Sequence, residues 1–304
     1  MEPTHFTGTV HSVFQRCCNL RLGSGLLLTL LASECGNQPH GVRLNSRKDF
    51  AFTGYVCVGD LVACRGGVVR IGAGRFSADL RTSIPWAVNL LKLRADLNVP
   101  GSAMAWRTAW RLLMDICDKT VGSGLHPAVG CGLPGRTIGL LGTLMKSTRA
   151  YRVEETGSAL LSLIGAGPGL TPAGDDFTVG YLAGLWSIAG VTPARHRFVY
   201  SLKPRVLRAV GMTNEISGSF IHHAGAGQVG EPLAHLATCI AQAASAPVVE
   251  AAMRLLLRIG HTSGADAGLG LLIALGAWGP AGLHNEIWRD CSDLSNVGLW
   301  KELG

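Results

Sequence analysis

Two short segments of this chain carry residue types that suit the binding of a small anion. The first, residues 167–176, has the sequence Gly-Pro-Gly-Leu-Thr-Pro-Ala-Gly-Asp-Asp and leads into an apolar stretch. Glycines let a backbone adopt positive φ and approach a ligand closely, and the free amides at a helix N-terminus bind phosphate or carboxylate. Thr171 can cap such a helix, and Pro172 suits its first position. The residues expected to bind substrate here are Gly167, Gly169, Thr171 and Gly174.

The second segment, residues 260–266, has the sequence Gly-His-Thr-Ser-Gly-Ala-Asp and also leads into an apolar stretch. It repeats the first segment when one gap is allowed after Ser263, so the two could form the halves of one site. The Ser-x-x-Asp spacing that starts at Ser263 also resembles a capping box, and helix capping alone accounts for part of the repeat. The residues expected to bind substrate in this segment are Thr262, Ser263 and Gly264.

Two further glycine patterns bear on these segments. Glycines four positions apart, at Gly180 and Gly184 and at Gly264 and Gly268, would let the two predicted helices cross closely and bring their N-termini together. Residues 122–128 match residues 167–173 at five of seven positions. In a chain with 41 glycines this match is either a third site loop or a chance similarity.

Four residues in these segments are candidates for catalysis. A carboxylate in the first turn of a helix interacts favourably with the helix dipole, which is enough to explain one of the adjacent aspartates Asp175 and Asp176. Successive helical side chains point about 100° apart, so the second is expected to accept hydrogen bonds from a ligand amide or to hold a metal. Histidine is a common general acid and base, which makes His261 the acid/base candidate. The predicted catalytic residues are Asp175, Asp176, His261 and Asp266.

Polar residues also interrupt a helix predicted over residues 204–223. Thr213 and Ser217 could face the site from this helix and are expected to bind substrate. His222 and His223 diverge on a helix and belong to no His-x-x-x-His pair. Residues 167–176 lack the Lys-Ser/Thr ending of a Walker loop, and no strand clearly precedes them, as a dinucleotide-binding loop requires. Nucleotide binding is therefore disfavoured, and the preferred interpretation assigns neither a metal nor a cofactor.

The elements that position these residues fall into two parts. Up to about Ile84 hydrophobic residues recur with a period of two, and after Pro85 the period becomes 3.6. Trp106 and Trp110 lie on one helical stripe with Leu113 and Cys117, a spacing more typical of a core than of cofactor stacking. The sequence predicts an α+β protein, with a small antiparallel β sheet or barrel over residues 1–85 and a larger all-α domain over residues 86–304. Strands are expected at residues 7–14, 26–31, 41–44, 50–58, 61–64 and 68–71, and further helices at residues 154–164, 176–189, 204–223, 232–243, 247–259 and 266–277.

Composition limits the class of protein. The chain has 304 residues, of which 47% are hydrophobic and 15% charged, and this excludes disorder. No apolar stretch reaches the roughly 20 residues of a membrane-spanning helix, and the N-terminus has no signal-peptide pattern. The nine cysteines are odd in number and include no Cys-x-x-Cys, which is typical of a reduced, cytoplasmic protein. The net charge of +7 is scattered, so we expect small acidic substrates and no nucleic acid.

Three strings together resemble one family. They are Gly165-x-Gly-Pro-Gly-Leu-Thr-Pro-Ala-Gly-Asp-Asp-Phe, Thr213-x-Glu-Ile-Ser and Gly260-His-Thr-Ser-Gly-x-Asp. The chain resembles the AllH-type subunit of oxamate carbamoyltransferase over most of residues 100–280. Ala265 departs from the pattern, because family members are expected to have a bulkier aromatic residue there. The β-rich N-terminus adds only general likeness.

The resemblance implies a role in anaerobic allantoin and purine breakdown. A multi-subunit complex would transfer the carbamoyl group of oxalurate to phosphate, giving oxamate and carbamoyl phosphate. The expected partners are therefore oxalurate, phosphate and other carbamoyltransferase subunits. Two alternatives stay open, namely a non-catalytic binding or assembly subunit, and a metal-dependent hydrolase of a small carboxylate or amide that uses the three aspartates and His261.

Overall fold

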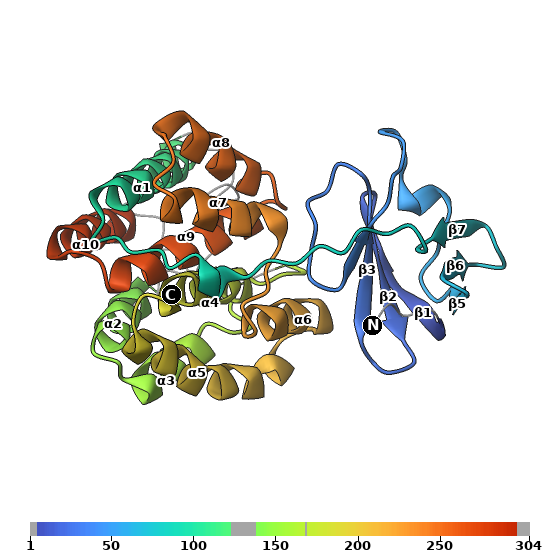
Figure 1. Ribbon diagram of the computed structural model, residues 1–304, viewed down its shortest axis with the longest axis horizontal. Coiled ribbons are helices and arrows are strands. Elements are labelled where there is room, and N and C mark those ends of the chain that lie inside the picture. Colours follow the sequence, from blue (N-terminus) through green and yellow to red (C-terminus); the bar gives the residue numbers. More distant parts are fainter. Residues whose placement is uncertain (1–4, 123–137, 168, 297–304) are drawn as a thin grey trace. The chain divides into compact units, whose positions relative to one another are not determined.

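A computed structural model describes residues 5–122, 138–167 and 169–296 of the chain, which form two compact units, residues 1–87 and 88–304. The first unit is a curled sheet and the second is helical, so the expected α+β class is confirmed (Figure 1). None of the described helices is long and apolar enough to cross a membrane.

The N-terminal unit is a seven-stranded sheet with the order β4-β3-β2-β1-β5-β6-β7. Neighbouring strands are antiparallel except for β3 and β4, which are parallel. Alternate residues of the strands face a core that includes Leu20, Leu30, Val62 and Val69, because side chains of a strand alternate between its two faces. The strands are β1 (His5–Val13), β2 (Cys17–Leu22), β3 (Leu27–Leu31), β4 (Gly41–Arg43), β5 (Leu61–Arg65), β6 (Val68–Ile71) and β7 (Phe76–Asp79).

Three features of this unit differ from the sequence prediction. Residues 50–58, expected as a strand, contain instead the short 3₁₀ helix η1 (Phe52–Gly54). Phe52 is fully buried there and Phe50 packs against its ring, so the apolar residues of this segment fill the core without joining the sheet. Strands β2 and β7 were not predicted as strands. β7 has only four residues, whereas β2 has six and alternates polar and apolar residues over Asn19–Leu22, a signal that could have identified it.

The second unit consists of helices around one hydrophobic core (Figure 1). Trp106, Trp110 and Leu113 of α1 are buried in it, as the helical stripe predicted, whereas the side chain of Cys117 lies outside the described residues. The α-helices are α1 (Pro100–Gly122), α2 (Ile138–Arg149), α3 (Val153–Leu161), α4 (Ala173–Ala189), α5 (Pro193–Arg208), α6 (Glu215–Ala224), α7 (Glu231–Ala241), α8 (Ala246–Leu256), α9 (Ser263–Ala277) and α10 (Ala281–Asn296). Short 3₁₀ helices lie at η2 (Leu90–Lys92) and η4 (Val210–Met212).

The helices α4 and α9 form the centre of this unit. Every residue of α9 from Gly264 to Ala277 is buried, and α4 is buried over nearly its whole length. A helix that is apolar on all sides has no face to offer to water, so it must be enclosed by other helices. The two loops singled out in the sequence therefore lead directly into the innermost helices of the protein.

The largest error concerns the helix predicted over residues 204–223. The chain forms α5, the 3₁₀ turn η4 and α6 there, and α5 already begins at Pro193. The first turn of α5 is capped by Thr192, whose hydroxyl accepts a hydrogen bond from the Arg195 amide. Pro204 lies further along, inside this helix. Proline is more common at the start of a helix, which made Pro204 resemble a first-turn residue.

Candidate functional site

The helices α4 and α9 contact each other backbone to backbone. A Cβ atom added to Gly180 would lie 1.9 Å from the Ala267 carbonyl oxygen, and one added to Gly270 would lie 2.1 Å from the Phe177 carbonyl oxygen. No side chain fits at either position, so the absence of a Cβ permits this approach. The expected close crossing is therefore confirmed on the α4 side.

The second glycine pair has a different partner from the one expected. A Cβ on Gly264 would lie 2.0 Å from the Leu256 carbonyl oxygen, and one on Gly268 would lie 3.0 Å from the Met253 side chain, both on α8. The prediction that Gly264 and Gly268 face α4 was wrong. On α9, Gly270 makes that approach, because it lies on another side of the helix.

This packing brings the starts of α4 and α9 together. The hydroxyls of Thr171 and Ser263 lie 2.9 Å apart and share a hydrogen bond, although they are 92 positions apart in the chain. Neither acts as the helix cap that the sequence suggested. Pro172 and Thr262 hold the N-cap positions, and neither cap makes a side-chain hydrogen bond. The two hydroxyls thus bond to each other between the loops and do not cap their own helices.

Asp176 lies beside this hydroxyl pair. Burial raises the pKa of its carboxyl from the ordinary 3.8 to about 6, hydrogen bonds from Ser263 and Thr171 oppose the rise, and the nearby charge of Asp175 adds to it. Its Oδ2 atom is buried and has no hydrogen-bond partner among the described residues. A buried carboxylate oxygen without a donor carries a free-energy cost that a ligand N–H would relieve.

Asp175 is positioned quite differently from its neighbour. It is 1% exposed, and its Oδ1 accepts a hydrogen bond of 2.7 Å from the Gly165 amide. Its Oδ2 accepts a second hydrogen bond from the Thr213 hydroxyl. Both oxygens are therefore used within the protein, and they fasten the loop before α4 to the segment before α6.

Asn214 continues this connection and was missed in the sequence. Its amide nitrogen donates to the Leu170 carbonyl oxygen at 2.8 Å, and its side-chain oxygen caps α6 by accepting from the Ile216 and Ser217 amides at 3.1 and 3.0 Å. Ser217 is buried, and its hydroxyl oxygen lies 3.5 Å from the side-chain nitrogen of Asn214. An asparagine at the start of a helix is a strong capping signal, which could have identified it.

The structure places the other predicted residues in three ways. Gly167 and Gly169 have φ angles of +111° and +100°, as expected for a loop that turns with positive φ. Gly174 serves packing, because an added Cβ would lie 1.8 Å from the Leu163 carbonyl oxygen.

Asp266 is fully buried in the first turn of α9, whereas His261 is exposed and makes no hydrogen bond or ion pair within the described part of the chain. Most of the possible third loop, residues 122–128, lies outside the described residues.

The described residues contain no group of three or more His, Cys, Asp or Glu side chains that could hold a metal ion. Within them, the arrangement that can bind a ligand consists of the hydroxyls of Thr171 and Ser263 and the carboxylate of Asp176. These groups can accept hydrogen bonds from an amide NH₂ and donate hydrogen bonds to an oxyanion.

Two family comparisons cover both units of the chain. The sequence model of a family described as oxamate carbamoyltransferase subunit AllH matches residues 163–275, and that of the AllH family N-terminal domain matches residues 1–85. The chain belongs to the AllH family. All the predicted site residues, from Gly167 to Asp266, fall within the first match. No solved structure matches the chain.

Membership of the AllH family assigns a general role to the chain. The family description names a subunit of a carbamoyltransferase, which agrees with the family resemblance found in the sequence. The second match extends the family to the N-terminal sheet, where the sequence had offered only general likeness. The family thus includes both the sheet and the two loops.

Proposed function

We propose that this AllH-family chain binds the carbamoyl donor of an oxamate carbamoyltransferase between the starts of α4 and α9. The reaction is the transfer of a carbamoyl group from oxalurate to phosphate, which gives oxamate and carbamoyl phosphate. The enzyme acts in the cytoplasm in anaerobic breakdown of allantoin and purines, and this chain is active only in a complex with other carbamoyltransferase subunits.

One observation carries this proposal. Oδ2 of Asp176, a carboxylate beside the Thr171–Ser263 pair, is buried and lacks a donor among the described residues. The carbamoyl group of oxalurate ends in an NH₂, which is a hydrogen-bond donor of the kind this oxygen lacks. The Thr171–Ser263 pair has two hydroxyl protons and uses one in its own hydrogen bond, so it can donate the other to the carbamoyl oxygen or to a phosphate oxygen. The site thus matches a ligand that has donors and acceptors side by side.

The chemistry needs no covalent enzyme intermediate. A phosphate oxygen attacks the carbamoyl carbon, the bond from that carbon to the oxamate nitrogen breaks, and the phosphate proton passes to the departing nitrogen. Negative charge develops on the carbamoyl oxygen during the attack. Hydroxyl donors already fixed at that position lower the barrier, and holding both reactants together lowers it further. In this proposal Thr171 and Ser263 stabilise the oxyanion, and Asp176 orients the NH₂ group.

The test compares matched variants of the assembled complex in single-turnover assays. Asp176→Asn keeps the size of the side chain but replaces one acceptor oxygen by a donor, and it should lower the rate at least about a hundredfold. Thr171→Val should have a similar effect. The control is Thr178→Val in the same helix, because the Thr178 hydroxyl donates only to the Gly174 carbonyl oxygen and should affect the rate little. Full activity in the first two variants refutes the proposal.

A second candidate function is supported by other contacts of the same loops. Both oxygens of Asp175 and the glycines at 174 and 264 serve internal packing, as they would in a non-catalytic assembly subunit. In that case Asp176→Asn leaves the affinity for oxalurate and phosphate unchanged. Thermal shift of the wild-type chain with oxalurate, oxamate, carbamoyl phosphate and phosphate separates the two functions, because a specifically bound ligand stabilises the fold.

A further inference from the structure

The N-terminal unit contains a hollow between the two edges of its sheet. The hollow has a volume of about 1410 Å³ and is lined by β4 and β7, by residues 44–50 and by residues 82–86. Because β4 and β7 are the first and last strands in the sheet order, each has one side without a neighbouring strand. Small-molecule pockets usually measure about 300–1,000 Å³, so this space is larger than one small ligand requires.

The free edge of β7 presents main-chain groups to this space. The Leu80 amide donates to the Gly67 carbonyl oxygen at 2.8 Å, and Gly67 and Leu80 are opposite residues in the register of β6 and β7. Hydrogen-bonded and non-bonded pairs alternate along an antiparallel ladder. Ser77 and Asp79 therefore point their N–H and C=O groups away from β6. Neither residue makes a main-chain hydrogen bond on that side within the described part of the chain.

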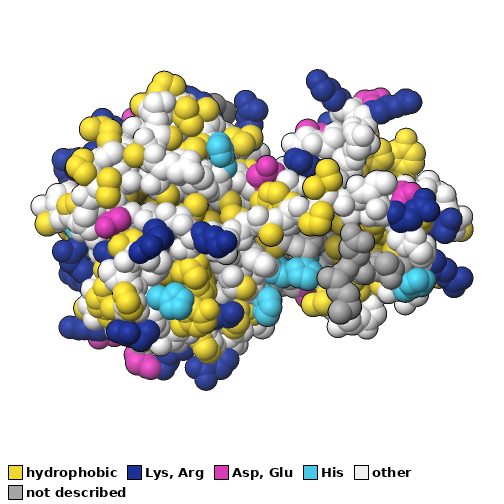
Figure 2. All heavy atoms as spheres, in the orientation of Figure 1, with side chains coloured by type: hydrophobic (Ala, Val, Ile, Leu, Met, Phe, Trp, Pro, Cys, Tyr) yellow, Lys and Arg dark blue, Asp and Glu magenta, His cyan; other side chains and the backbone are white. Residues whose placement is uncertain are grey.

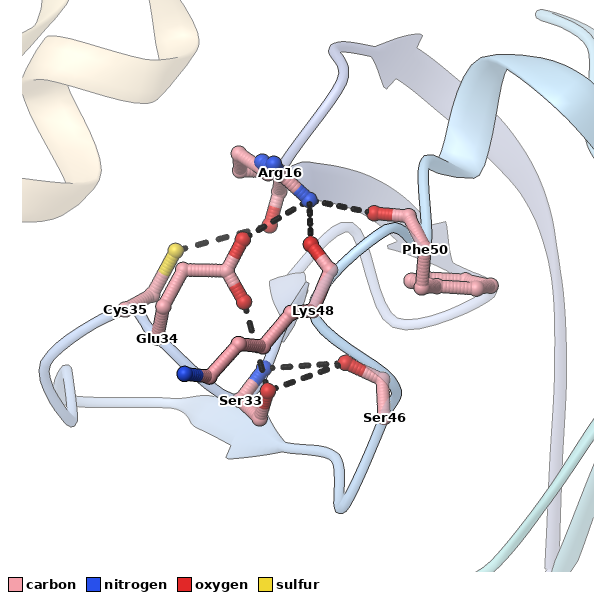
Figure 3. Close-up of polar contacts among 7 residues, drawn as sticks. All are labelled: Arg16, Ser33, Glu34, Cys35, Ser46, Lys48 and Phe50. Carbon is pink, nitrogen blue, oxygen red and sulfur yellow. Dashed lines mark hydrogen bonds and ion pairs between the residues drawn. The ribbon is translucent and has the colours of Figure 1, made fainter.

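The wall opposite this edge is fixed in place (Figure 3). Arg16 donates to the Phe50 and Lys48 carbonyl oxygens at 2.6 and 3.1 Å and forms an ion pair of 2.8 Å with Glu34. The Ser33 amide donates to the Ser46 hydroxyl at 3.0 Å. These contacts fasten the segment that lines the hollow to the turn after β3. These hydrogen bonds and the ion pair hold this wall of the hollow in place.

The lining contains aromatic rings and a small excess of basic side chains, with Arg43, Arg47 and Arg75 against Asp49 and Asp79. Phe50 stacks on Tyr55 with ring centroids 5.4 Å apart and lies 6.1 Å from Phe76, and all three rings line the hollow. Residues 1–87 contain nine Lys and Arg against five Asp and Glu, and basic side chains project from this unit in Figure 2. Arg47 lines the hollow, is exposed and forms no ion pair within the described residues. These features favour an acidic partner with some apolar side chains.

We propose that β7 binds an extended, acidic segment of another subunit of the carbamoyltransferase, which adds to the sheet as a further strand and occupies the hollow. Its main chain pairs with Ser77 and Asp79, its inward side chains contact the aromatic rings, and its acidic residues face Arg47. Strand addition uses main-chain hydrogen bonds for affinity and alternate side chains for specificity. The family description as a subunit supplies the class of partner, and the proposal does not depend on where substrate binds.

The test uses the full chain co-expressed with the other carbamoyltransferase subunits. Ser77→Pro removes the outward N–H, and proline is tolerated on an edge strand because that N–H makes no bond within the sheet. Ser77→Ala keeps the N–H and is the matched control. We expect recovery of the complex to fall at least tenfold for Ser77→Pro and to stay unchanged for Ser77→Ala. In the wild-type complex, hydrogen exchange of residues 76–81 should be slower than in the chain alone.

Each other outcome overturns the proposal. Normal assembly of Ser77→Pro excludes pairing at this edge, and so does unchanged exchange of residues 76–81 in the wild-type complex. If Ser77→Pro does not fold alone, the exchange measurement decides. Protection of the same residues in a dimer of this chain assigns the edge to a second copy instead. Thermal shift with oxalurate and phosphate is run on the same samples, so that a failure of the proposed ligand site is recognised separately.

Discussion

Replacing Asp176 by asparagine should change how stability depends on pH. The folded protein holds the Asp176 proton with a pKa of about 6, whereas the unfolded chain releases it near the ordinary value of 3.8. Because the folded-state pKa is the higher one, the protonated carboxyl favours folding. Asp176 therefore lowers the stability of the wild-type protein as the pH rises from about 4 to about 6, and the loss is complete above that range.

The size of the effect follows from the pKa. A tenfold change in proton affinity is worth about 1.4 kcal/mol, so a pKa raised from 3.8 to about 6 corresponds to about 3 kcal/mol. Asparagine has no proton to lose. Between pH 4 and pH 7 the unfolding free energy of Asp176→Asn should thus rise by about 2 kcal/mol relative to that of the wild type, because the rest of the change falls below pH 4.

The assay is urea unfolding followed by tryptophan fluorescence at several pH values. The signal reports mainly on the helical unit, because Trp106, Trp110, Trp186 and Trp278 are buried in it. Asp176→Ala serves as a second variant. It opens a small cavity and is less stable at every pH, but it should show the same pH trend relative to the wild type. A difference that does not vary with pH in either variant would refute the assignment of a buried, poorly solvated carboxyl at this site.

Three further predictions concern the elements that hold the site. Gly270→Ala should destabilise the protein by more than about 3 kcal/mol in urea unfolding, because the added Cβ would meet the backbone of α4. In the control Gly139→Ala the added Cβ has free space, so this variant should be as stable as the wild type or more stable. Equal effects of the two substitutions would contradict the close contact. Asn214→Ala should cost about 1–2 kcal/mol through the lost α6 cap, and Asn214→Asp should recover the cap but not the bond to the Leu170 carbonyl oxygen. If Asn214→Asp is as stable as the wild type in thermal unfolding, the bond to Leu170 contributes nothing, and if both variants lose the same stability, the cap contributes nothing. Asp175→Ala leaves a buried amide and hydroxyl without an acceptor and should cost at least about 3 kcal/mol; a loss below 1 kcal/mol in the same assay would show that water replaces it.

The sequence predicted the elements of the site better than their contacts. A repeated Gly/Thr/Asp pattern before two apolar helices was enough to expect that their starts meet, because small residues allow close crossing. The hydrogen bond between Thr171 and Ser263 joins loops far apart in the chain, whereas local capping rules assign each residue to its own helix. Tertiary contact overrides the local preference here.

The prediction of the fold also failed at positions where tertiary packing decides the local structure. The β-then-α order follows from the change in hydrophobic period at Pro85, and it was predicted. The 3₁₀ turn at Phe52 was not predicted, because Phe52 is buried in the core without belonging to a strand. The continuation of α5 through Pro204 was not predicted either, because this exposed proline suggested the start of a helix. Asn214 was not predicted as a cap, because the start of α6 lay inside the longer helix predicted over residues 204–223.

The contact of Gly180 and Gly270 with opposing backbone also limits how the site can diverge. Side-chain contacts between helices can be widened or narrowed in small steps by exchanging one residue for another of different size. A backbone contact has no such intermediate states, so the separation of Thr171 and Ser263 is a fixed length in this fold. Relatives that act on a larger or smaller substrate are then expected to differ at the tips of the two loops, as at Leu170 and His261, and to keep both glycines.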